Sequence, residues 1–214
     1  TLVSNGSLLN RFHEIGEWLH RINISLHTLD QEQYQDITQT KTRLDHILNN
    51  IELMRNLYPN LQIRLNATVV KWRNDSIEDI SSLVHLAEKY NLSIKFVELF
   101  PNTEPGFLPL TSIEPLLQKI GFTKKQEKPR QIIYEKWSTT IILTKISCGA
   151  TGLEENIISP QESDIFVSPD GLISPYPSSR HKVSLYDAIK EKNSEEIWTL
   201  LQQSIDEFCI PLEK

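Results

Sequence analysis

Apolar and polar positions follow two different periods along the first half of the chain. Four short runs are apolar or alternate with the period of a β-strand: 1–4, 21–26, 63–70 and 94–100. Three stretches place apolar residues three and four positions apart, as one face of a helix does: 8–19, 44–57 and 77–90. A polar stretch at 30–40 is expected to add a short helix, and Asn74-Asp75 to cap the helix at 77–90. This alternation predicts parallel βαβ units over residues 1–101, as an incomplete barrel or an open sheet.

The pattern changes after Pro101. A loop rich in proline and glycine is followed by these expected elements: a helix at 113–120, antiparallel strands at 131–134 and 139–146, a hairpin at 165–173 and a helix at 184–208. The hairpin is expected to turn at Pro169-Asp170-Gly171, because these residue types favour tight turns. The sequence therefore predicts an α/β protein, with a parallel segment at 1–101 and a smaller α+β extension at 102–214.

The composition is that of an ordinary globular protein. Of the 214 residues, 39% are hydrophobic and 23% charged, and the formal net charge of −6 gives no reason to expect a nucleic-acid or membrane partner. No apolar run approaches the ~20 residues that span a bilayer, and no secretory signal opens the chain. Cys148 and Cys209 form no CxxC pair, so we expect a reducing, cytoplasmic setting without a disulfide framework. The chain opens in a strand without an initiator Met, so we expect further residues upstream.

Few side chains outside the strand ends indicate chemistry. The six histidines show no metal-ligand spacing, and there is neither a Gly-rich phosphate loop nor a GxSxG motif. His27 is the one histidine at the end of an expected strand. It is expected to hydrogen-bond a substrate, to act as a proton donor, or to be a structural or solvated side chain.

Polar fragments fall at the carboxyl ends of three of the four expected parallel strands: Ser4-Asn5-Gly6, Asn23-Ile24-Ser25-Leu26-His27 and Val97-Glu98-Leu99-Phe100-Pro101. In a parallel barrel that end carries the active site. Together with the run at 64–70, these fragments resemble the third to sixth strands of the partial (βα)6 TIM-like barrel of radical S-adenosylmethionine (SAM) enzymes. The order and spacing of the fragments are most similar to those of the molybdenum-cofactor GTP cyclases. The sequence TADGKL near the carboxyl terminus of those enzymes resembles residues 168–173.

The resemblance implies roles for individual positions. It assigns seven residues to bound SAM: Ser4, Asn5, Gly6, Ser25, Asn66, Leu99 and Phe100. Arg64 would turn a cation toward a substrate phosphate, and His27 would contact the substrate. Taken singly, Asn5 would be an ordinary turn residue and Ser25 a helix cap, and these alternatives stay open.

The resemblance also identifies groups that the chain lacks. Radical SAM chemistry needs a 4Fe-4S cluster held by three thiolates, which the family carries as CxxxCxxC after its first strand, a position upstream of Thr1. The ligands of the second cluster of the GTP cyclases, and their substrate-gripping arginines, would fall on other residue types: Ser159, Glu162, Asp164, Phe166 and Tyr176. These side chains replace neither the thiolates nor the positive charge. We therefore expect the first cluster only with the upstream region, and we do not expect GTP cyclisation.

Three functions remain open. The first is a portion of a radical SAM enzyme that generates a 5′-deoxyadenosyl radical and acts on an unknown small-molecule or peptide substrate, with residues 102–214 as the substrate cap. The second is a degenerate, non-catalytic module that binds a nucleotide-like ligand or a partner protein. The third is an unrelated TIM-like domain whose strand-end Asn and Ser residues only form turns. A CxxxCxxC motif upstream would distinguish the first from the second.

Overall fold

The structure, a computed structural model, divides into two compact units. It describes residues 1–11, 13–99, 104–128, 131–145, 166–174 and 182–209, apart from the side chains of residues 166 and 205–209. The first unit is Thr1–Ile146 and the second is Ser147–Lys214. The first unit extends past residue 101, where we expected the parallel segment to end, because later strands join the same sheet.

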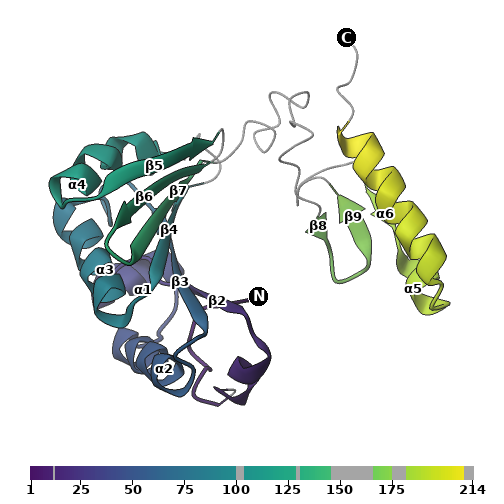
Figure 1. Cartoon of the computed structure of the whole chain (residues 1–214), viewed down its shortest axis with the longest axis horizontal. Coiled ribbons are helices and arrows are strands. Elements are labelled where there is room, and N and C mark those ends of the chain that lie inside the picture. Colours follow the sequence, from purple (N-terminus) through teal and green to yellow (C-terminus); the bar gives the residue numbers. More distant parts are fainter. Residues whose placement is uncertain (12, 100–103, 129–130, 146–165, 175–181, 210–214) are drawn as a thin grey trace, which may run out of the picture. The chain divides into compact units, whose positions relative to one another are not determined.

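The first unit is built on a seven-stranded sheet with the strand order β1-β2-β3-β4-β7-β6-β5 (Figure 1). Its strands are β1 (Leu2–Ser4), β2 (Arg21–Ser25), β3 (Gln62–Val69), β4 (Ser93–Glu98), β5 (Thr123–Lys128), β6 (Gln131–Lys136) and β7 (Thr139–Thr144). Strands β1 to β4 pair in parallel, and β7 pairs in parallel with β4. Strands β6 and β5 complete the sheet in antiparallel pairing. The predicted α/β class and the parallel order of the first four strands are confirmed.

Helices pack against one face of this sheet (Figure 1). They are α1 (Gln31–Thr38), α2 (Leu44–Leu57), α3 (Ile77–Tyr90) and α4 (Glu114–Lys119), with the short 3-10 turns η1 (His13–Trp18) and η2 (Leu110–Ile113). In β2, β3 and β4, every second residue of the central positions faces the helices and is buried, as Ile24, Leu65 and Phe96 are. This burial supplies most of the stabilising free energy, at roughly 25 cal/mol for each Å² of apolar surface.

The alternate residues of the same strands point to the opposite face, which carries polar residues on β2 and β3 and a mixture of polar and apolar residues on β4 and β7. We call this the polar face and define it by Asn23, Ser25, Arg64, Asn66 and Thr144. The parallel register pairs Asn23 with Arg64 and Ser25 with Asn66, so these side chains form two neighbouring rows. A strand buried on both faces would be apolar throughout, so the polar face is shaped for something other than core packing.

Local details differ from the sequence expectation at three places. Residues 8–11 form turns and residues 13–18 form η1, where a regular helix over 8–19 was expected. Gly16 packs against the Tyr58 ring, and a Cβ there would come within 2.3 Å of Tyr58 Cε2. Strand β5 was not expected, because both of its faces are polar and exposed. Helix α3 is capped by Ser76, whose hydroxyl oxygen accepts the N–H of Asp79, and not by Asn74 or Asp75.

The second unit contains a small antiparallel sheet and two helices. The strands are β8 (Phe166–Val167), β9 (Leu172–Ser174) and β10 (Val183–Ser184), in the order β10-β9-β8. The expected Pro-Asp-Gly hairpin is confirmed, since the N–H of Gly171 donates to the Ser168 carbonyl oxygen at 2.9 Å. The expected terminal helix is divided into α5 (Tyr186–Lys190) and α6 (Ser194–Cys209), with Lys192 in a left-handed conformation between them. Over the described residues, no helix is long and apolar enough to cross a membrane.

A buried tyrosine ties the antiparallel end of the first unit to α4. Tyr134 in β6 is fully buried, and its hydroxyl donates to a Glu114 carboxylate oxygen. Lys124 in β5 pairs with the same carboxylate at 3.0 Å and with Glu127 at 3.0 Å. Burial and the adjacent Glu114 carboxylate raise the pKa of Tyr134 to about 12, so the phenol remains protonated and donates its hydrogen at neutral pH.

We expect Tyr134→Phe to lower the free energy of unfolding by about 1.5–3 kcal/mol, because it removes a hydrogen bond to a charged group. Urea denaturation monitored by circular dichroism measures the change. The control is Tyr90→Phe, which removes an exposed tyrosine–carboxylate bond to Glu52 and should change stability by less than about 0.5 kcal/mol. Equal effects of the two substitutions would contradict the role assigned to Tyr134.

Candidate ligand-binding site

The turn that follows β1 uses its own side chains to hold its shape. The Ser4 Oγ accepts the N–H of Gly6 at 3.1 Å. The Asn5 Oδ1 accepts both the N–H and the hydroxyl of Ser7, at 3.0 and 2.8 Å. The side-chain oxygens of Ser4 and Asn5 therefore accept hydrogen bonds within the turn.

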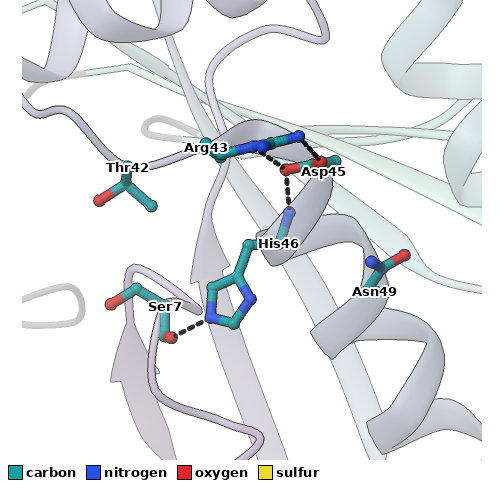
Figure 2. Close-up of a pocket in the computed structure, with 6 residues that line it drawn as sticks. All are labelled: Ser7, Thr42, Arg43, Asp45, His46 and Asn49. Carbon is teal, nitrogen blue, oxygen red and sulfur yellow. Dashed lines mark hydrogen bonds and ion pairs between the residues drawn. The ribbon is translucent and has the colours of Figure 1, made fainter.

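Helix α2 fixes this turn against the sheet. The buried Asn50 amide donates to the Gly6 carbonyl at 2.8 Å. His46 Nε2 donates to the Ser7 carbonyl at 2.8 Å (Figure 2). Gly6 has φ of +80°, and a Cβ there would lie 3.0 Å from Ile47 Cγ2, so this position requires glycine. A cavity of about 530 Å³ adjoins the turn, lined by Ser7, Thr42, Arg43, Asp45, His46 and Asn49 (Figure 2). Its charged groups pair with each other, Arg43 with Asp45.

The polar face contains buried hydrogen-bonding atoms without partners. Within the described part of the chain, four such atoms lie on this face: Asn23 Oδ1, Arg64 Nε, Asn66 Oδ1 and Thr144 Oγ1. They come from β2, β3 and β7. Leaving a buried polar group unsatisfied costs about 1–3 kcal/mol, and native proteins rarely keep several such groups in one place without a purpose. Four on one sheet face identify it as a candidate ligand-binding surface.

Arg64 lies toward the amino-terminal edge of the polar face. It lines a cavity of about 420 Å³ together with Arg21 and Arg55, and no acidic residue contributes to that wall. Arg21 donates twice to the Gln62 Oε1, at 3.0 and 2.7 Å. Burial, and to a smaller extent the charge of Arg21, lower the pKa of the Arg64 guanidinium. This edge therefore presents positive charge, as an anionic ligand would require.

His27 lies at the opposite, carboxyl-terminal edge. Its Nδ1 accepts the backbone N–H of Thr68 at 3.1 Å. It lines a cavity of about 400 Å³ whose wall consists of His27, Asp36, Ile37, Gln39, Thr68, Val70, Arg73 and Leu99. Burial lowers the pKa of His27. The structure therefore brings His27 and Leu99 to one cavity and places Arg64 at another.

Asn74 holds the loop between β3 and α3 at this edge. It is 1% exposed, and its amide nitrogen donates to the carbonyl oxygens of His27 at 2.7 Å and Thr68 at 2.9 Å. Its Oδ1 accepts the N–H of Val70 at 2.7 Å. One side chain thus joins the ends of β2 and β3 and fixes the backbone that carries His27. Arg73, from the same loop, pairs with Asp36 of α1.

The other predicted site residues divide into those that the structure describes and those that it does not. Ser25 and Asn66 are register partners on the polar face, as their strand-end positions suggested. Glu98 accepts the N–H of Leu110 at 3.2 Å and thereby positions η2. Phe100 lies outside the described residues, as do Ser159, Glu162, Asp164 and Tyr176, and the side chain of Phe166 is not described. Among the described residues, no three His, Cys, Asp or Glu side chains form a group that could hold a metal.

Sequence reasoning missed Asn23 and Asn74. The signal for Asn23 was present, because it alternates with Arg21 and Ser25 in a strand whose intervening positions, Ile22 and Ile24, are apolar. Asn74 had no distinguishing signal, since an Asn before a helix is far more often a cap than a buried bridge.

Comparison with known proteins supports the family resemblance. The chain is 28% identical over 218 aligned residues to a GTP 3',8-cyclase of Campylobacter jejuni, covering 94% of this chain and 62% of that protein. It is 27% identical over 218 residues to the GTP 3',8-cyclase of Helicobacter pylori, covering 95% of this chain and 63% of that protein. A further match is the molybdenum cofactor biosynthesis protein moc-5 of Caenorhabditis elegans, 33% identical over 104 residues, which are 47% of this chain and 16% of that protein.

No family model matches the chain. The chain spans less than two thirds of the length of the curated cyclases that it matches. The resemblance to the molybdenum-cofactor GTP cyclases, inferred from the strand-end fragments, is confirmed by these relatives.

We expect Asn74→Asp to lower the free energy of unfolding by at least about 3 kcal/mol at pH 7, because a buried carboxylate would face two carbonyl oxygens. Burial raises the pKa of the introduced carboxyl group above its unfolded value. The loss should therefore shrink as the pH falls toward 5 and the group becomes protonated. Urea titrations at several pH values measure this. The neighbouring Asp75→Asn keeps an oxygen to accept the N–H of Trp72 and should be nearly neutral; comparable losses in both variants would refute the bridging role.

We expect His27 to titrate below its unfolded pKa of about 6.5, with the proton on Nε2 in the neutral form. Its folded pKa is depressed, so its contribution to stability is present above about pH 6.5 and is lost as the pH falls. Two-dimensional ¹H–¹⁵N NMR of the imidazole reports both the pKa and the tautomer, and the urea-unfolded chain provides the reference. Titration at or above the unfolded value, or a proton on Nδ1 at neutral pH, would contradict the observed geometry.

Proposed function

We propose that the chain is the later portion of a radical SAM enzyme related to the molybdenum-cofactor GTP cyclases, and that its polar face binds SAM. One observation carries this proposal: the unpartnered polar atoms of Asn23, Asn66, Arg64 and Thr144 share one sheet face. A ligand with amino, carboxylate and ribose hydroxyl groups offers the donors and acceptors that these atoms lack. Similarity to curated GTP 3',8-cyclases over 94% of the chain supports the same reading.

The residues of the polar face fit the chemistry of SAM. Asn23 and Asn66 each have a carbonyl oxygen free to accept hydrogen bonds, and an ammonium group or ribose hydroxyls supply the matching donors. Ser25 is the register partner of Asn66 and adds a hydroxyl beside it. The backbone of the turn after β1 would border the same ligand, held in place by Asn50 and His46. Leu99 would edge the adenine.

The iron–sulfur cluster does not fit the residues of this chain. Three thiolates are needed, and the sequence holds two cysteines, Cys148 and Cys209. The cluster would therefore be held by a region upstream, as in the CxxxCxxC pattern of the family. When bound to such a cluster, SAM supplies a 5′-deoxyadenosyl radical. The contribution of this chain would be to bind and orient the adenosyl group and to exclude water around it.

A partial (βα)6 TIM-like barrel agrees with the arrangement of the sheet. Strand β1 forms an edge of the sheet and pairs only with β2 among the described strands. Val3 on this edge is 63% exposed. An edge with such a residue favours pairing with further strands, and two more parallel βα units would extend β1–β4 to six strands. The extension at 102–214 would then supply the substrate cap.

The substrate is proposed to differ from GTP. At the positions where the cyclases carry their second cluster and its arginines, this chain has Ser159, Glu162 and Tyr176, with an acidic Asp164 beside them. Because these residues cannot hold the second cluster, they also favour the second candidate. This is a non-catalytic module that keeps the pocket for a SAM-like ligand and binds a nucleotide-like ligand or a partner protein. The two candidates share the pocket and differ in whether SAM is cleaved.

The test uses the whole protein, including its upstream region, reconstituted anaerobically with iron and sulfide. We expect visible charge-transfer absorption from the cluster. Once an added electron donor such as dithionite has reduced the cluster, we expect SAM to be cleaved to methionine and 5′-deoxyadenosine. Asn66→Ala should weaken SAM binding by about tenfold, because it removes an acceptor from the pocket. Asn56→Ala, an exposed position on α2, is the matched control and should bind as the wild type does.

Binding of SAM without 5′-deoxyadenosine would favour the non-catalytic module. Absence of both cluster and SAM binding would refute the radical SAM proposal. Unchanged affinity in Asn66→Ala would place the SAM pocket away from the polar face.

A further inference from the structure

The imidazole of His27 takes the place of a backbone carbonyl in the parallel ladder. The N–H of Leu26 donates to the Asn66 carbonyl at 2.9 Å, which is the last regular bond between the two strands. In a parallel pair, the N–H of Thr68 would next donate to a carbonyl on the β2 side. Here it donates to His27 Nδ1 at 3.1 Å instead. The side chain therefore occupies a fixed place between the strand ends.

This bond determines which ring nitrogen carries the proton. A backbone N–H can only donate, so His27 Nδ1 must present its lone pair. Nε2 therefore carries the hydrogen in the neutral ring. No described residue accepts a hydrogen bond from Nε2, although His27 lines the carboxyl-edge cavity of about 400 Å³. His27 thus contributes an N–H donor whose ring is held in place by the Thr68 bond and which no described residue engages.

The rest of the cavity wall indicates what this donor would meet. Ile37, Val70 and Leu99 supply apolar surface. The two charged residues of the wall, Arg73 and Asp36, pair with each other and leave little net charge. Gln39 and Thr68 add polar side chains, and the Gln39 amide already donates to the Asp36 carbonyl. A largely apolar wall that also carries the His27 donor suits a flat, uncharged heterocycle with an acceptor nitrogen. Leu99 belongs to this wall and is the residue that would edge the adenine under the proposed function.

We propose that His27 donates its Nε2–H to a ring nitrogen of the adenine of the bound adenosyl group and so selects for that base. This assignment rests on the proposed function, because it presumes that the adenosyl group lies at the carboxyl ends of the strands. Asn74 acts as a positioning residue, since it holds the carbonyl of His27 at 2.7 Å and that of Thr68 at 2.9 Å.

Two substitutions distinguish the role of His27 Nδ1 as an acceptor from the role of Nε2 as a donor. In His27→Asn, the amide oxygen stands near the position of Nδ1 and can still accept the Thr68 N–H, while the donor in the cavity is lost. In His27→Gln, the longer side chain reaches the position of Nε2 and keeps a donor there. We expect His27→Asn to fold as the wild type does and to bind S-adenosylhomocysteine about tenfold more weakly. We expect His27→Gln to retain most of the affinity.

The measurement is isothermal titration calorimetry of the whole protein with S-adenosylhomocysteine, followed by adenosine and its 1-, 3- and 7-deaza analogues. One deaza analogue should bind the wild type about tenfold more weakly than adenosine does and show no further loss in His27→Asn. Because this comparison can be made on the wild-type protein, it remains decisive if His27→Asn fails to fold.

If adenosine and all three deaza analogues bind the wild type equally, the assignment of His27 is overturned while the proposed function stands. The same conclusion follows if folded His27→Asn binds S-adenosylhomocysteine as tightly as the wild type. If the wild type binds no S-adenosylhomocysteine, the proposed function itself fails.

Discussion

The parallel pairing of β2 with β3 is the constraint on which the rest of the site depends. It sets Ser25 beside Asn66 and Asn23 beside Arg64, because residues paired in register point to the same side of a sheet. Helices cover the other side, where Ile24 and Leu65 are fully buried. A shift of one residue in register would turn the polar side chains into the core. The large apolar burial of one face therefore fixes the polar residues of the other.

The unpartnered polar atoms of the polar face lower the stability of the fold, and the burial of the apolar core offsets this loss. Each unpartnered buried polar atom costs about 1–3 kcal/mol, and a domain is stable by only about 5–15 kcal/mol in total. Four such atoms on one face are a substantial share of that margin. A ligand that supplied their hydrogen bonds would recover part of it, so ligand binding and the stability of the first unit should be coupled.

At the carboxyl-terminal edge of the sheet, hydrogen bonds from two side chains to the backbone hold the ends of β2 and β3 together. Asn74 joins the ends of β2 and β3 through three hydrogen bonds, and His27 completes the ladder through its ring. Both residues are fixed by the backbone rather than by other mobile side chains. This rigidity is what a site needs in order to orient a base without loss of conformational entropy on binding.

Much of this arrangement could be predicted from the sequence, and the exceptions have physical reasons. Strands such as 63–70 and the helix at 44–57 were predictable, because one side of each is apolar at a regular period. Strand β5 was not, because its stability comes from pairing with β6 and its residues are polar on both faces. Ser25 and Asn66 were predictable as strand-end polar residues. The roles of Asn74 and of the His27 ring depend on contacts 41 or more residues away, which no local pattern records.

The most direct test of the central claim is a crystal structure of the whole protein with S-adenosylhomocysteine bound. We predict that the ligand lies on the polar face and that Asn23 Oδ1 and Asn66 Oδ1 accept hydrogen bonds from it. A ligand bound elsewhere, with these oxygens paired instead to another segment of the protein, would contradict the account.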